Sequence, residues 1–166
     1  SLEPHKLERI LPLAAEAGTE TVGFLLREDG SVPATLDERL SLAATLVNTA
    51  TEAGLKAENL VIDPVLVPIT WGDGSSQARN VLSCITYLPE LLGFSVKTVV
   101  GLSNLTSGSS DQSASPLLEE AYLAMLAEAG LDMALMNVFR KRSVTKARIC
   151  DAIRNSRVWS WGEFEL

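Results

Sequence analysis

A glycine recurs about every 37 residues along the chain, and this period limits the folds that the sequence can adopt. The four glycines are Gly18, Gly54, Gly93 and Gly130, and three of them end the same tripeptide, Glu-Ala-Gly. Glycine directly after a helix adopts the left-handed conformation at little cost. A short apolar run, typical of a strand buried on both faces, follows each glycine within a few residues. The repeat therefore predicts a series of helix–glycine–strand units.

The apolar runs predict strands at residues 21–26, 60–67, 98–102 and 133–136. Apolar residues at helical spacing fill the segments before and between these runs, so these segments are predicted helices. Thr35 and Glu38 have the spacing of a capping box at the start of the second helix. Ser115 as cap and Pro116 as first helical residue indicate the start of the fourth helix. Pro12 must either kink the first helix or begin its regular part.

The predicted order is one helix followed by four strand–helix units. Such alternation indicates an α/β fold with a parallel sheet and helices outside it. A period near 37 fits either a doubly wound sheet or a β/α barrel, and four strands are half of an eight-stranded barrel with two unpaired edges. The chain has no starting Met. We expect residues 1–166 to form a single domain that is the C-terminal part of a larger protein or that assembles with another chain.

Charge and cysteine content argue against several function classes. The chain has 14 basic and 21 acidic residues, whereas a general nucleic-acid binder needs a basic surface. Cys84 and Cys150 are far apart and accompany a single histidine, which argues against a disulfide framework and a zinc site. No apolar run is long enough for a membrane span, and no signal-peptide pattern opens the chain. We therefore expect a cytoplasmic chain with reduced thiols, no bound metal, no nucleic acid and no membrane contact.

In both architectures the functional residues follow the carboxyl ends of the strands. Asp63 ends the second predicted strand, where it could accept hydrogen bonds from a ligand or brace the loop. Gly101, Ser103 and Asn104 follow the third strand and could contact a ligand or form an ordinary turn. Asn137 ends the fourth strand and has the same two interpretations.

Other segments also have two interpretations. Residues 27–30 follow the first strand, and the serine-rich segment 106–115 is either a mobile lid or a solvated loop. Residues 140–157 contain seven basic side chains and one acidic one, which indicates either a docking surface for an acidic partner or phosphate, or a solvated helix face. Trp71, Trp159 and Trp161 are predicted to pack. The chain has no phosphate-binding loop, dinucleotide fingerprint, Ser-His-Asp set or zinc-protease motif.

Taken together, these stretches resemble the pterin-binding methyltransferases that pass a methyl group between methyltetrahydrofolate and a corrinoid protein. This family includes the methyltetrahydrofolate:corrinoid/iron–sulfur protein methyltransferases and the folate domain of cobalamin-dependent methionine synthase. The matching stretches are LPLA at 11–14, NLVIDP at 59–64, KTVVGLSN at 97–104 and AMLAEAGLDMALMN at 124–137. Order and spacing are kept from about residue 4 to residue 140, and GLSN with an upstream IDP is fairly specific to this group.

The resemblance implies a (β/α)8 TIM barrel with the pterin in its mouth, of which this chain is the C-terminal half with about four βα units. It implies that Asp63 accepts hydrogen bonds from the pterin ring and that Gly101, Ser103 and Asn137 line the pocket. Asn104 would hydrogen-bond N5, the nitrogen that carries the methyl group, and stabilise it as the C–N bond breaks. The implied acceptor is the cobalt of a cobalamin-type corrinoid on a separate corrinoid (iron–sulfur) protein.

The chain departs from this family in two places. The strands with the family's other pterin-binding Asp and Asn have no counterpart, so we expect a homo-oligomer or a separate N-terminal half to complete the barrel. Loop 105–115 has no basic residue where the relatives carry an Arg. The alternatives are a non-catalytic pterin- or partner-binding fragment, and an unrelated β/α-barrel lyase or phosphate-binding enzyme. The residues after Asp63-Pro64 and after Ser103 disfavour the related dihydropteroate synthases.

Overall fold

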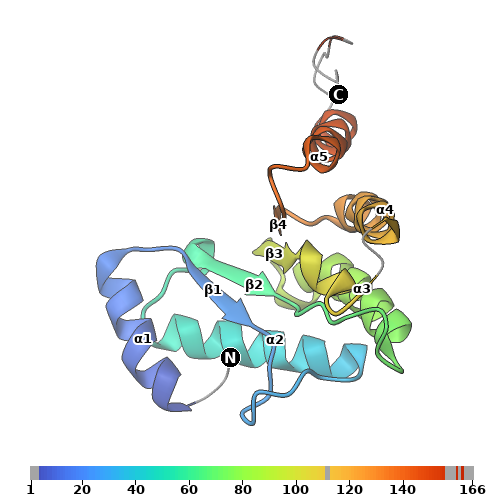
Figure 1. The fold of residues 1–166 in the computed structure, drawn as a ribbon. Coiled ribbons are helices and arrows are strands. Elements are labelled where there is room, and N and C mark those ends of the chain that lie inside the picture. The colour runs from blue at the N-terminus through green and yellow to red at the C-terminus, as the bar shows by residue number, and fades with distance from the viewer. Residues whose placement is uncertain (1–3, 111–112, 156–159, 161, 163–166) are drawn as a thin grey trace.

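The computed structural model describes residues 4–110, 113–155, 160 and 162 (Figure 1). One helix is followed by four strand–helix units, as the glycine repeat predicts. The strands are β1 (Thr21–Phe24), β2 (Leu60–Asp63), β3 (Lys97–Gly101) and β4 (Met133–Leu135). The helices are α1 (Pro4–Ala17), α2 (Leu36–Glu52), α3 (Gly74–Leu92), α4 (Ala114–Ala129) and α5 (Lys141–Arg154), with short 3₁₀ helices η1 (Ala57–Asn59) and η2 (Leu102–Thr106).

The four strands form a parallel arrangement in the order β1-β2-β3-β4. Val22 lies opposite Val61, Ile62 lies opposite Thr98, and Val100 lies opposite Ala134. A doubly wound sheet reverses its strand order at a switch point, whereas a barrel adds strands in sequence order. The α/β prediction is therefore confirmed, and the sequential order is compatible with half of a β/α barrel.

The core lies between the sheet and the helices on one of its faces. Figure 1 shows α2 running alongside β1 and β2, with α3 and α4 farther along the same side. Leu46 of α2 packs so closely on Gly23 that a Cβ at position 23 would meet its side chain at 2.4 Å. Two clusters of buried side chains result. The first includes Leu11, Leu46, Ala50, Leu60, Ile62 and Leu88, and the second includes Val81, Ile85, Val100, Leu123 and Leu126.

The opposite face of the sheet leaves apolar side chains of its edge strands in solvent. Val22 and Phe24 of β1 and Met133 and Leu135 of β4 are exposed, although they alternate with residues that face the helices. Within the described residues, β1 and β4 each pair with one neighbour only. Among the described strands the sheet therefore has an unpaired edge on each side, with exposed apolar side chains on both edge strands, so further strands could be added.

Two predicted helix starts have different outcomes. Thr35 caps α2 as expected, since its Oγ1 accepts a hydrogen bond from the Glu38 backbone N–H at 3.3 Å. The predicted start of α4 is wrong, because this helix begins at Ala114 and Ser115 already lies in its first turn. Pro12 lies inside α1, whose last residue is Ala17.

A glycine at the start of α3 provides a direct test of the loop that follows β2. A Cβ at Gly74 would lie 2.4 Å from the Pro68 carbonyl oxygen and 2.6 Å from that of Ile69. Both contacts are with backbone, so we expect Gly74→Ala to lower the free energy of unfolding by about 1–3 kcal/mol. Urea denaturation measures this change. Gly72→Ala is the matched control, because a Cβ there meets nothing within 4 Å, and equal stability of the two variants would contradict the prediction.

Candidate functional site

The predicted site residues come from three neighbouring strand ends. Asp63 is the last residue of β2, and Gly101 is the last residue of β3. Ser103 and Asn104 lie in η2, directly after β3, and Asn137 follows β4 by two residues. Because β2, β3 and β4 are adjacent and parallel, their carboxyl ends meet at one edge of the sheet. The structure therefore places all five residues at the same end of the fold.

Asp63 is a buried carboxylate with only one oxygen bound to the protein. Its side chain is 5% exposed, and Oδ1 accepts a hydrogen bond from the Val65 backbone N–H at 2.8 Å. No hydrogen bond from the described residues reaches Oδ2. Burial raises the pKa of Asp63, while the Val65 N–H and the nearby Arg39 guanidinium oppose this effect. The loop-bracing interpretation is confirmed for one oxygen, and ligand binding stays a prediction for the other.

The turn after Asp63 is strained. Val65 has a φ of 62°, and it is the only residue other than glycine with positive φ in the described part of the chain. This conformation is a clear outlier for a β-branched side chain, and such strain persists only where the surrounding structure holds it. The predicted strand 60–67 therefore ends early, at Asp63, because Pro64 and Val65 turn the backbone away from the sheet.

Arg39 holds this turn in place, and it is not among the residues predicted from the sequence. This α2 residue is fully buried, and its Nη1 donates to the carbonyl oxygens of Pro64 and, at 3.1 Å, of Val65. Its Nη2 donates to Oε1 of Gln77, whose Nε2 in turn donates to Oδ2 of Asp73 at 2.9 Å. A signal was present, because position 39 falls on the apolar stripe of its helix, one turn before Ala43.

Gly101 and Asn104 form a close pair at the end of β3. A Cβ at Gly101 would lie 3.0 Å from Nδ2 of Asn104, so a side chain there would crowd the Asn104 amide. Ser103 and Asn104 are both exposed. Within the part of the chain that the structure describes, neither side chain has a hydrogen-bond partner. The Asn104 amide thus lies next to the backbone of β3, with both its donor and its acceptor available.

Asn137 has the ordinary turn role that was one of its two interpretations. Its Oδ1 accepts a hydrogen bond from the Phe139 backbone N–H at 3.0 Å, which closes a turn of the Asx type. The two residues after it are strongly exposed, and Phe139 is 91% exposed. The Nδ2 group and the second lone pair of Oδ1 remain available for a ligand.

Several of the other charged side chains form ion pairs within the protein. Arg27, after β1, donates to both carboxylate oxygens of Glu38 and to Ser31 Oγ at 2.9 Å. In the basic segment, Arg140 pairs with the buried Glu119 at 2.7 Å, and Arg142 pairs with the buried Glu120 at 3.3 Å. For these two arginines the acidic partner is therefore α4. Arg157 lies outside the described residues.

The tryptophans and the predicted lid segment are described only in part by the structure. The prediction that Trp71 packs is wrong, because it is 54% exposed on the loop between β2 and α3. Trp159 and Trp161 lie outside the described residues, as do residues 111 and 112 of the predicted lid. At the start of that segment, Thr106 donates from Oγ1 to Oε1 of Glu119 at 2.5 Å, so this end is tied to α4.

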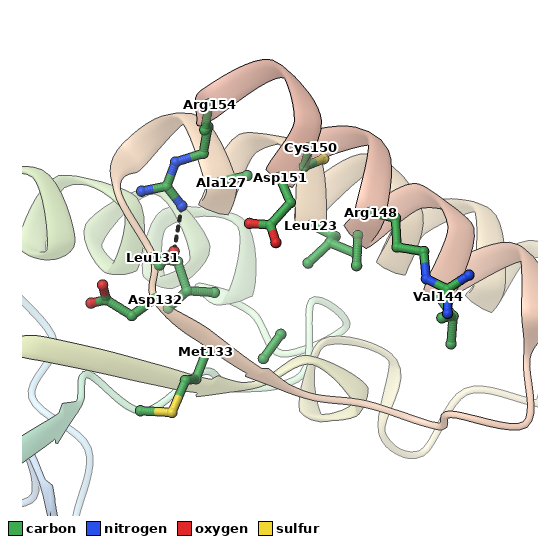
Figure 2. Close-up of a pocket in the computed structure, with 12 residues that line it drawn as sticks. Leu123, Ala127, Leu131, Asp132, Met133, Val144, Arg148, Cys150, Asp151 and Arg154 are labelled. Atoms are coloured by element: carbon green, nitrogen blue, oxygen red, sulfur yellow. Dashed lines mark hydrogen bonds between the residues drawn. The ribbon is translucent and has the colours of Figure 1, made fainter. Parts of the chain in front are cut away.

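A separate cavity of about 240 Å³ lies between α4, α5 and the start of β4 (Figure 2). Its lining includes Leu123, Asp132, Cys150 and Arg154, whose Nη1 donates to the Leu131 carbonyl at 2.6 Å. Burial raises the pKa of the Cys150 thiol, which argues against a reactive thiolate there. The cavity is at the amino end of β4, so it contains none of the predicted site residues.

No family model matches the chain. The described residues contain no group of three or more His, Cys, Asp or Glu side chains that could hold a metal ion. None of the helices within those residues is both long and apolar enough to cross a bilayer.

Proposed function

We propose that this chain binds the pterin of methyltetrahydrofolate at the carboxyl ends of its strands and supports methyl transfer between N5 and the cobalt of a separate corrinoid protein. The observation that supports this most is Asp63, a buried carboxylate whose second oxygen has no partner among the described residues. Burying a charged group without full pairing is costly, so such a carboxylate at a strand end favours a binding role over a purely structural one.

The ring chemistry of a pterin matches this carboxylate. The pyrimidine part of the ring presents neighbouring N–H donors on one edge, and a carboxylate accepts such a pair in a charge-assisted arrangement. Gly101 leaves the end of β3 free of a side chain, and Ser103 and Asn137 offer neutral hydrogen-bonding groups at the same edge. A flat, polar heterocycle is therefore the ligand class that fits these residues.

The proposed reaction places Asn104 at N5. The corrinoid protein would supply a reduced cobalt centre that accepts the methyl group. The electron pair of the breaking C–N bond stays on N5, which takes a proton from solvent. An amide cannot supply that proton itself, so Asn104 would orient N5 and stabilise the charge that develops there. Its amide has no other partner in the described part of the chain, which leaves it available for this role.

The open sheet favours completion by further strands. A hollow of about 260 Å³ between α1 and β1 is lined by Leu7, Ile10 and Leu11, by the residues of β1 and by Leu60. Together with the exposed Phe24 and Leu135, it gives both edge strands exposed apolar surface, and each of them has only one strand partner among the described residues. We propose that a second copy of the chain, or a separate N-terminal half, closes a (β/α)8 barrel around the pterin.

A second candidate is a fragment that binds a pterin or a partner without catalysing transfer. The observation that favours it is the same open sheet, because four strands supply walls for only part of a barrel mouth. In that case the strand-end residues would retain binding while the geometry needed for the reaction would be incomplete.

Two measurements on the same preparation separate these candidates. Calorimetric titration with methyltetrahydrofolate measures binding, and the visible absorbance of the reduced corrinoid iron–sulfur protein measures methyl transfer. Binding together with chain-dependent loss of the reduced-cobalt absorbance supports the methyltransferase. Binding without transfer supports the second candidate, and a folded chain that does not bind would contradict both.

A further inference from the structure

Arg39 is an unusual residue for the interior of a small α/β fold. It lies on the buried face of α2 and has no exposed surface. Burial lowers the pKa of this guanidinium, and Asp63 is among the nearby groups that oppose the effect. Arginine remains charged in proteins, so this buried cation needs acceptors around it.

The acceptors are concentrated on one short turn. Nη1 of Arg39 donates to the carbonyl oxygens of Pro64 and Val65, and Nη2 donates to the Gln77 side chain. Nε has no hydrogen-bond partner within the part of the chain that the structure describes. Two of the three acceptors are thus backbone atoms of the residues that follow Asp63, and the contacts join residues 25 and 26 positions apart in the sequence.

The same turn is held from its other side by Asp63. Its Oδ1 accepts the Val65 N–H at 2.8 Å, while Arg39 holds the carbonyl oxygens of Pro64 and Val65. Val65 needs this support, because a β-branched residue rarely adopts a positive φ such as its 62°. The Pro64 carbonyl and the Val65 N–H belong to one peptide unit, so the bond from Arg39 to that carbonyl also fixes the direction of the N–H. With the flanking chain fixed, relaxation of φ at Val65 requires this peptide unit to rotate. The N–H would then turn away, and the Asp63 carboxylate would lose the bond that fixes its orientation.

We propose that Arg39 is a positioning residue, which holds the strained Asp63–Pro64–Val65 turn so that the carboxylate of Asp63 presents its free oxygen to the ligand. This inference rests on the proposed function, since the ligand in question is the pterin. Arg39 itself is fully buried and does not contact the ligand.

The decisive experiment is a double-mutant cycle between Arg39→Met and Val65→Gly. Methionine retains much of the volume of arginine without its donors, and glycine adopts positive φ at no steric cost. We expect Arg39→Met to weaken methyltetrahydrofolate binding about tenfold, and Val65→Gly alone to change it less than about threefold. Val65→Gly in the Arg39→Met background should restore binding to within about threefold of the parent, because the turn no longer needs support.

A core-filling role for Arg39 would give a different pattern. Glycine at position 65 cannot repair a packing defect at position 39, so the double variant would then bind as weakly as Arg39→Met or more weakly. Unchanged binding in Arg39→Met would also overturn the proposal. If Arg39→Met does not fold, Arg39→Lys replaces it in the cycle, since lysine keeps the charge but lacks the fork that spans the three acceptors. The same loss and the same rescue are expected.

Amide hydrogen exchange at residue 65 tests this inference independently of the proposed function. We expect Arg39→Met to accelerate exchange of this amide about tenfold and Val65→Gly to reverse the change, whether or not the pterin binds. If the parent chain binds no methyltetrahydrofolate but exchange follows this pattern, the proposed function is wrong and the support of the turn by Arg39 stands. If the exchange rate of this amide is the same in Arg39→Met as in the parent, Arg39 does not support the turn.

Discussion

Replacing Asp63 with asparagine is expected to weaken methyltetrahydrofolate binding about 10- to 100-fold, the effect of losing hydrogen bonds to a charged acceptor. Asparagine can still accept the Val65 N–H through its Oδ1, so the turn keeps its brace. Its Nδ2 then faces the ring N–H donors in place of Oδ2, and two donors repel each other. Titration calorimetry measures the change. Asp37→Asn, an exposed change of the same kind on α2, is the matched control and should bind like the parent.

The same variant should be at least as stable as the parent at neutral pH. Burial raises the pKa of Asp63 above its ordinary value of 3.8, so ionisation of this group favours the unfolded chain. Well below pH 3.8 the carboxyl is protonated in both states and the two proteins should unfold alike. The advantage of Asp63→Asn should grow as the pH rises from 3.8 to the higher folded pKa, and it should level off above the folded pKa. Lower stability of the variant at neutral pH would contradict the idea that the buried Asp63 carboxylate serves binding and lowers the free energy of unfolding.

Removing the Asn104 side chain should act on the reaction and much less on binding. In the proposed arrangement its amide interacts with N5 most strongly when charge develops there, so we expect Asn104→Ala to slow methyl transfer about 100-fold. Pterin affinity should fall less than about fivefold, the value of one neutral hydrogen bond. Asn48→Ala is the control, because Asn48 is an exposed residue within α2 and away from the strand ends.

Single-turnover kinetics with the reduced corrinoid protein provide the rate in this experiment, and calorimetry provides the affinity. Equal losses in rate and affinity would mean that Asn104 binds the pterin without a special role at N5. An unchanged rate would remove it from the site altogether.

The sequence predicted the order of helices and strands well because the signals are local. The Gly-ended helices and apolar runs place every strand near its observed position, from β1 at Thr21 to β4 at Met133. The boundaries were less predictable. The second strand stops at Asp63 instead of residue 67, because the positive φ of Val65 depends on a guanidinium from another helix.

The candidate site was predictable only in part for the same reason. The strand-end rule finds Asp63 and Asn104 from their place after apolar runs. It cannot find Arg39 or Gln77, which reach the turn through tertiary contacts from α2 and α3. A charged residue on the apolar stripe of a predicted helix is the signal that would have pointed to Arg39. Trp71 was misassigned because composition and position give no sign that its loop leaves it exposed.

Native mass spectrometry of the chain with and without methyltetrahydrofolate tests the central claim most directly, with Asp63→Asn measured beside it. We expect an assembly of more than one chain to gain the mass of one pterin per site, and the Asp63→Asn assembly to gain none. A folded chain that gains no pterin mass in any assembly state, or an Asp63→Asn variant that gains it as readily as the parent, would contradict pterin binding at Asp63.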